Sequence, residues 1–206
     1  MKNILSYLVL LCFITFSTSC TNSTSNDTSS EEPTEQMPLG EAAPETPSEA
    51  STFETIVVKD GIASPRKEMK GQIAGVDVAI NYGSPSVKGR TIWGDLVPFD
   101  QIWRTGANEA TTFEVANPVN IEGQNLAPGK YSLFTIPKED GWTIIFNEVA
   151  EQWGHYDYDE GKDVLRVDVS AGEAEEMSET MEFVVEGSEI VILWANLKVP
   201  FNLEKS

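Results

Sequence analysis

The chain has 206 residues, of which 33 are acidic and 14 basic, and its formal net charge at pH 7 is −19. So acidic a protein repels phosphate backbones and anionic lipid surfaces, which argues against nucleic acid as a partner. Once an N-terminal leader and a polar segment are set aside, roughly 150 residues remain, the length of one domain.

Residues 1–19 have the pattern of a secretory signal peptide. The basic residue Lys2 precedes an apolar stretch at 4–16, and small residues at 17–19 stand before Cys20. This order of basic, apolar and small residues is typical of a cleaved leader. The apolar stretch is too short for a membrane-spanning helix, which needs about 20 residues. We therefore expect the mature protein to begin at Cys20.

Cys20 is the predicted lipidation site. A cysteine directly after the cleavage point resembles a bacterial lipoprotein leader, in which a palmitate-type acyl group on the thiol holds the chain at a membrane. Cys12 leaves with the leader, so the mature chain has one cysteine and no internal disulfide. Acylation would protect this thiol in an oxidising compartment. The expected location is the bacterial cell envelope, at the outer membrane; a secreted soluble protein is the alternative, because the residues also fit an ordinary cleavage site.

Residues 20–55 are predicted to form a disordered tether. The segment is rich in Ser, Thr, Pro and Glu and contains neither Lys nor Arg. With so few large apolar residues it cannot bury enough surface to offset its ordering entropy. At its end, residues 53–58 are expected to form either an added edge strand or a staple onto the folded domain.

Residues 56–206 are predicted to form an antiparallel β-sandwich of eight or nine strands. Apolar and polar residues alternate with a period of two in most of this part, which indicates strands with one buried face. Turn-forming residues such as Pro128-Gly129 separate the strands. Short strands at this spacing favour a sandwich or barrel. At most one short turn of helix is expected, near Glu173–Met177, and the clearest strands are at 76–82, 131–136, 142–146, 165–169, 181–185 and 190–195.

Three parts of the sequence are more specific than alternating strands require. They lie at 82–98, at 103–111 (Trp-Arg-Thr-Gly-Ala-Asn-Glu-Ala-Thr) and at 127–137. Together with Trp153-Gly154 and 163–167, they resemble the domain-of-unknown-function family numbered 2911, over roughly residues 64–199. The resemblance implies kinship with exported bacterial proteins and brings no established activity.

The loop around Gly106 supplies the first half of a candidate ligand site. Arg104 offers five hydrogen-bond donors, Glu109 can accept a proton, and Asn108 adds an amide. Gly106 gives the backbone the freedom to bring these groups together. Such a loop suits a carboxylate, a phosphate or a sugar. The alternative is that Arg104 and Glu109 pair with each other for structural reasons.

A second loop, at 153–163, supplies the other half. It contains Trp153, Tyr156, Tyr158 and Asp163, which combine aromatic faces for stacking with a carboxylate. Loops on a rigid scaffold often carry binding groups, although aromatic residues also fill sandwich cores. If the fold brings both loops to one end, they form a single concave ligand site.

No metal and no cofactor is expected. The chain has one histidine, and Asp157–Gly161 departs from a calcium loop because its glycine stands at position five instead of six. Phosphate-loop and nucleophile-elbow spacings are missing from the sequence. Three functions remain: a noncatalytic binding module for a glycan, a peptide or an envelope protein, which we favour; a small hydrolase that uses carboxylates with Arg104; and a purely structural module.

Overall fold

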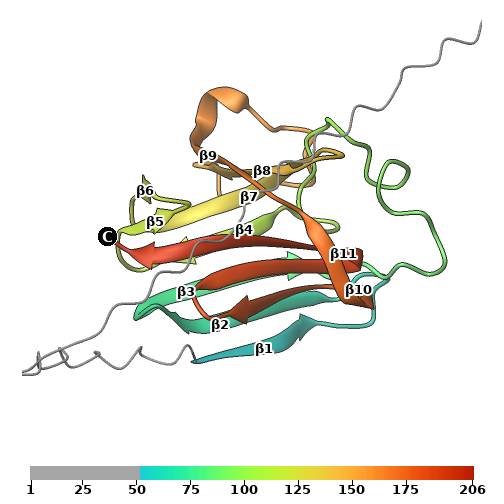
Figure 1. Cartoon of the computed structure of the whole chain (residues 1–206), viewed down its shortest axis with the longest axis horizontal. Helices are drawn as coiled ribbons and strands as arrows, with labels where there is room; N and C mark the ends of the chain where they lie inside the picture. Colours follow the sequence, from blue (N-terminus) through green and yellow to red (C-terminus); the bar gives the residue numbers. More distant parts are fainter. Residues whose placement is uncertain (1–51) are drawn as a thin grey trace, which may run out of the picture. The chain divides into compact units, whose positions relative to one another are not determined.

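The computed structural model describes residues 52–206 and shows strands β1–β11 with one short 3-10 helix, η1 (Figure 1). The predicted signal peptide, the lipidation of Cys20 and most of the predicted tether lie outside the described residues. Between residues 52 and 206, no helix has the length and apolar character needed to cross a bilayer.

The larger sheet has seven antiparallel strands in the order β1-β2-β3-β4-β7-β8-β9. Strands β1 and β9 are its edges, and a long connection, drawn mostly in green in Figure 1, joins β3 to β4. The bounds are β1 Thr52–Lys59, β2 Arg66–Ile73, β3 Val76–Gly83, β4 Thr111–Val115, β7 Gly129–Pro137, β8 Trp142–Asn147 and β9 Asp163–Val169.

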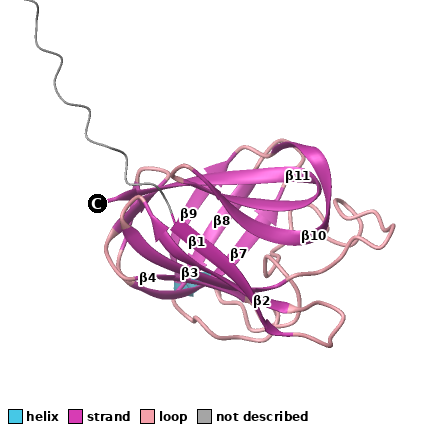
Figure 2. Ribbon diagram, turned by 90° about the horizontal axis from the view of Figure 1, so that it is seen from below, coloured by secondary structure: helices cyan, strands magenta, loops and turns pink. Residues whose placement is uncertain are grey.

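The smaller sheet has four antiparallel strands in the order β10-β11-β5-β6. Figure 2 shows that strands make up most of the described chain, and η1 at Glu160–Lys162 is the helical turn among residues 52–206. The bounds are β10 Gly172–Glu186, β11 Glu189–Lys205, β5 Val119–Ile121 and β6 Gln124–Leu126.

The core lies between the two sheets. Val76, Val78, Ile80 and Tyr82 on β3 are buried, while Asp77 between them is exposed, as alternation predicts. Buried side chains of β10 and β11 join the same hydrophobic cluster. This arrangement confirms the predicted antiparallel β-sandwich.

Four tryptophans form an aromatic cluster at one end of this core. Trp93 contacts Trp103, Trp142 and Trp194 edge-on, with ring centroids 5.0–5.9 Å apart. Trp103 and Trp194 stack at 5.8 Å with an interplanar angle of 17°. Large buried aromatic faces in such arrangements stabilise a core beyond their buried area alone.

Three details differ from the sequence expectations. Residues 52–206 form eleven strands, two more than the larger number expected, because β5 and β6 are only three residues long each. Strand β1 begins at Thr52, so the end of the predicted tether is an edge strand paired with β2. Near Glu173–Met177, where at most a short turn of helix is expected, the chain is part of β10. Glu173 pairs with Leu197, and the register shifts between Glu173 and Ser178.

The outer face of the seven-stranded sheet has a covered half and an open half. Over β7 and β8, Phe134 and Ile145 are buried beneath Ile102 and Tyr158 from two loops. Over β1–β4 no such apolar cover is present among residues 52–206, and polar side chains face outward. The open half carries the first candidate site.

Candidate functional site

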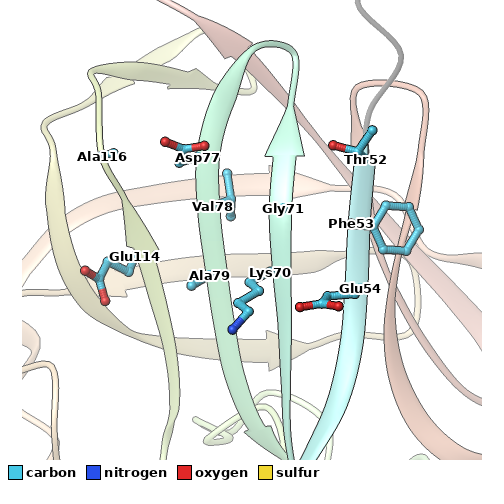
Figure 3. Close-up of a pocket in the computed structure, with 10 residues that line it drawn as sticks. All are labelled: Thr52, Phe53, Glu54, Lys70, Gly71, Asp77, Val78, Ala79, Glu114 and Ala116. Carbon is cyan, nitrogen blue, oxygen red and sulfur yellow. The ribbon is translucent and has the colours of Figure 1, made fainter.

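The open half of the sheet is hollowed into a trough. It consists of two hollows of about 590 and 540 Å³ that share Ala79 and Glu114. The first hollow lies over β1–β4 and is drawn in Figure 3. The second continues toward β7 and reaches Gln152 and Trp153.

Strand register explains the shape of the trough. Cross-strand pairing places Glu54, Lys70, Ala79, Glu114 and Lys130 in one row across β1, β2, β3, β4 and β7. Figure 3 shows the first four in this order. The small Ala79 side chain at the centre leaves a depression between longer neighbours. The row therefore forms the floor of the trough. On each side of Ala79 it carries one acidic and one basic side chain.

Trp153 forms one wall of the trough. Its side chain is 59% exposed, an unusual state for a residue this large and apolar. Backbone hydrogen bonds hold the segment: the Ala110 N–H donates to the Gln152 carbonyl at 3.0 Å, and the Gly154 N–H donates to the Asn108 carbonyl at 3.1 Å. The indole is thus presented to solvent from a fixed backbone.

Two polar side chains beside Trp153 complete this wall. The Gln152 amide donates to Ser132 Oγ and to the Val149 carbonyl, while its Oε1 is buried and has no hydrogen-bond donor. The Glu151 carboxylate accepts a hydrogen bond from Lys130 Nζ at 2.8 Å. This contact lowers the pKa of Glu151 below its usual range.

Arg66 lines the second hollow, and its guanidinium is already hydrogen-bonded within the protein. Its guanidinium donates to the carbonyls of Glu109, Ala110 and Asn81, each at 3.1 Å, and to Asn81 Oδ1. The Glu109 carboxylate lies 3.8 Å from Nη1. Burial lowers the pKa of Arg66, and the Glu109 and Glu151 carboxylates oppose that effect. Arg66 therefore joins β3 to the 103–111 loop and has little capacity left for a ligand.

A separate cavity of about 420 Å³ lies at the β3–β4 connection, and we call it the Arg104 pocket. Its polar groups include Arg90, Arg104, Asn108 and His155, and its apolar walls include Trp103 and Trp194. No aspartate or glutamate lines it. The remaining lining residues are Ser64, Pro85, Leu96, Val97, Pro98, Gln101, Ile102, Gly106 and Ala107.

Close backbone packing fixes the loop that carries Arg104. A Cβ atom on Gly83 would lie 2.1 Å from the Ala107 carbonyl oxygen, so glycine is required where β3 meets the loop. Thr105 and Asn108 have positive φ of 51° and 64°, which few non-glycine residues adopt. The Thr111 hydroxyl donates to the Thr105 carbonyl at 2.7 Å. The loop is thus held in one unusual conformation.

The Arg104 guanidinium has no partner among residues 52–206. It forms no hydrogen bond or ion pair there, and its Nε is buried. Burial lowers the pKa of Arg104, and the nearby Tyr156 hydroxyl opposes this effect. His155 Nδ1 and Trp194 Nε1 are also buried without a partner. An arginine stays charged in proteins, so this pocket holds an uncompensated positive charge.

The residues predicted to form one ligand site are divided among three places. Arg104 and Asn108 line the Arg104 pocket, whereas Glu109 and Trp153 line the trough. The alternative pairing of Arg104 with Glu109 is not formed, because Glu109 pairs with Arg66. The two loops therefore line two separate cavities in the described part of the chain.

Tyr156 lies beside the Arg104 pocket. It stacks on His155 with ring centroids 5.0 Å apart and is 77% exposed.

Tyr158 and Asp163 form the third place, a structural network. The Tyr158 hydroxyl donates to Asp163 Oδ2 at 2.6 Å, and Arg166 donates to both residues at 2.7 Å. Burial and the Asp163 carboxylate raise the pKa of Tyr158 to about 12. Tyr158 also packs edge-on against Phe134, at 4.9 Å between ring centroids. These contacts attach the 153–163 loop to the sheet.

Several site residues were missed by sequence reasoning. Lys70, Glu114 and Lys130 occupy outward positions of their strands, which the alternation reveals, but their common row depends on strand order. Neither Arg66 nor Gln152 belongs to a recognisable motif: Arg66 follows Ser64-Pro65, and Gln152 precedes Trp153. Among the described residues, no group of three or more His, Cys, Asp or Glu side chains is placed to hold a metal ion.

The fold and the two cavities define an all-β sandwich protein with a polar trough on one sheet and a cationic pocket at one loop. The chain belongs to the family described as protein of unknown function (DUF2911), whose match covers residues 64–203. That match includes Arg66, Arg104, Glu109 and Trp153. No curated protein and no solved structure matches the chain.

Proposed function

We propose that this protein is a lipid-anchored, noncatalytic module of the bacterial cell envelope that binds a glycan in the trough. The observation that carries the proposal is the exposed Trp153 indole on the wall of a long polar hollow. Solvent-exposed tryptophan is costly unless another surface covers it, and a rigid aromatic side chain is a frequent anchor in binding sites.

The chemistry of the trough suits a sugar. A pyranose ring has an apolar face of C–H groups, which an indole can cover, and a rim of hydroxyls that both donate and accept hydrogen bonds. Glu114 offers an acceptor, and Lys70, which lies 3.6 Å from the Glu68 carboxylate, offers donors. The Glu114 carboxylate has no hydrogen-bond or ion-pair partner between residues 52 and 206. The trough therefore holds unused polar groups beside an apolar platform.

Charge and length indicate an extended, uncharged glycan. The two hollows together contain six acidic residues (Glu54, Glu68, Asp77, Glu109, Glu114 and Glu151) and four basic ones (Lys59, Arg66, Lys70 and Lys130). This balance gives no strong attraction for a polyanion. Because the hollows adjoin, a ligand can extend over several strands.

The trough supports binding better than carboxylate-dependent hydrolysis. A general acid at neutral pH needs a carboxyl group whose pKa is raised. The pKa of Glu151 moves in the opposite direction because Lys130 stabilises the charged form.

A binding test on the full chain checks the glycan proposal. Peptidoglycan, chitin and soluble β-glucans are incubated with the protein, and bound protein is measured. Trp153→Ala should lower affinity for the retained glycan at least tenfold, since truncation of a tryptophan that anchors a binding site typically costs about 2 kcal/mol or more. Tyr156→Ala is the matched control, because Tyr156 is exposed but does not line the trough. Equal binding by Trp153→Ala, or release of reducing sugars by the wild type, would overturn the proposal.

The lipid anchor is tested separately. Cys20→Ser removes the acylated thiol, so the protein should move from the detergent phase to the aqueous phase on phase partitioning, because a single chain or none anchors weakly. If Cys20→Ser stays in the detergent phase, the anchor at Cys20 is wrong, whatever the outcome for glycan binding.

A further inference from the structure

The Arg104 pocket has a charge that contrasts with the rest of the chain. The protein carries a net charge of −19, yet this pocket contains two arginines and a histidine and no acidic side chain. Arg90 donates to backbone carbonyls of Ser86 and Val87, so part of its capacity is used. Arg104 has no such partner among residues 52–206. The positive charge at Arg104 is therefore the unsatisfied feature of the pocket.

A partly buried charge without a counter-ion is unfavourable, since desolvation is not offset by pairing. The loop nevertheless keeps Arg104 in place through the close approach of Gly83 to Ala107 and the hydrogen bonds of Thr105 and Thr111. Structural roles of arginine usually engage several of its donors, as Arg66 does. An unpaired guanidinium on a fixed backbone has its donors free to bind an anion through charge-assisted hydrogen bonds.

The walls of the pocket indicate what accompanies the anion. Trp103 and Trp194 form a stacked aromatic wall, and Ile102 adds an aliphatic surface. Trp194 is 2% exposed, and its Nε1–H has no acceptor in the described part of the chain. A cavity of about 420 Å³ is within the range of small-molecule sites. Inorganic phosphate would use the charge but would make no contact with the apolar wall.

We propose that the Arg104 pocket binds a small organic carboxylate, whose carboxylate pairs with the Arg104 guanidinium and whose apolar body packs against Trp103 and Trp194. The planar fork of arginine matches a carboxylate through two parallel hydrogen bonds. Asn108 and His155 line the same cavity and offer further polar contacts. This site is separate from the glycan trough, and neither proposal depends on the other.

The test uses 3-phenylpropionate as the probe and 3-phenylpropanol as its uncharged counterpart. Binding to the full chain is followed by tryptophan fluorescence and by NMR of the indole and arginine Nε–H signals. We expect saturable binding of 3-phenylpropionate, at least tenfold weaker binding of 3-phenylpropanol and of inorganic phosphate, and a shift of the Arg104 Nε–H signal.

Substitutions test whether 3-phenylpropionate binds in the Arg104 pocket. Arg104→Gln should weaken 3-phenylpropionate binding at least tenfold, and Arg104→Lys should weaken it less, because lysine keeps the charge but loses the fork. Lys88→Gln removes the same charge from an exposed position on the same connection that does not line the pocket, and should bind normally. Trp153→Ala should also bind normally. Equal affinity for the acid and the alcohol in the wild type, or full binding by a folded Arg104→Gln protein, would overturn the proposal.

Discussion

Arg66 and Arg104 are both partly buried arginines near the 103–111 loop, yet the structure treats them in opposite ways. Arg66 donates to three carbonyls and an amide oxygen and lies 3.8 Å from the Glu109 carboxylate. The Arg104 guanidinium has no hydrogen-bond or ion-pair partner among residues 52–206 and faces a cavity without acids. Equal residue type and similar burial thus do not imply equal roles. The number of satisfied donors separates a structural arginine from a candidate binding arginine.

The largest effect is expected from Arg66→Met. The substitution leaves the carbonyls of Asn81, Glu109 and Ala110 without this donor and removes the link between β3 and the loop. A buried polar group left without its partner costs about 1–3 kcal/mol, so we expect a loss of a few kcal/mol. Urea denaturation of the full chain measures the free energy of unfolding. A loss below about 1 kcal/mol would show that Arg66 is not the structural member of the pair.

Gly83→Ala should be the next most damaging change. A Cβ at this position would lie 2.1 Å from the Ala107 carbonyl oxygen, so the Arg104 loop must move. We expect a loss of about 1–3 kcal/mol and weaker 3-phenylpropionate binding. Gly172→Ala is the control, because its Cβ would meet only Lys198 Cγ at 3.9 Å. A Gly83→Ala protein with the melting temperature of the wild type would contradict the close contact.

Glu109→Gln should have a small effect. The Glu109 carboxylate is about half exposed and 3.8 Å from Arg66, and such ion pairs contribute about 0–1 kcal/mol. The Glu109 carbonyl, which accepts from Arg66, is unaffected by the change. A thermal melt should therefore shift by only a few degrees. A loss as large as that of Arg66→Met would mean that the carboxylate, and not the backbone carbonyls, holds Arg66.

Arg104→Met should have the smallest effect on stability, and its sign is expected to be neutral or favourable. Replacing an unpaired, partly buried charge with an apolar side chain removes a desolvation cost and adds contact with Trp103 and Trp194. The same denaturation experiment should give a free energy of unfolding equal to or above that of the wild type. A marked loss would show that Arg104 is structural after all and would end the contrast with Arg66.

The sequence predicts the sandwich well because one buried face per strand leaves a clear alternation. The residues at 76–82 and 181–185 show this, and both lie in strands whose alternate side chains are buried. Residues 173–177 do not, because this part of β10 is mostly exposed and carries little apolar signal. Within this stretch Glu173 pairs with Leu197 of β11, and the register shifts before the next pair at Ser178, so no regular alternation is imposed on it.

The candidate sites are harder to predict, because backbone conformation divides residues that are close in sequence. Positive φ at Thr105 and Asn108 turns the loop so that Arg104 and Glu109 line different cavities, although only four residues separate them along the chain. The residue types suggested a cationic clamp with aromatic faces, and both features occur. Their spatial grouping depends on strand order and on the Gly83 contact, neither of which a local motif encodes.

Strand β1 has a consequence for how the domain responds to mechanical load. It is the edge of the larger sheet, all eight of its residues are exposed, and it is the first described strand of the chain. Tension applied to the chain ahead of Thr52 acts on β1 first and opens its pairs with β2 from Thr52–Gln72 onward. The buried residues of β2 and β3 stay packed while this happens, since β1 adds none to the core. Detachment of β1 would lengthen the chain and relieve the tension. The trough would lose only the residues that β1 contributes.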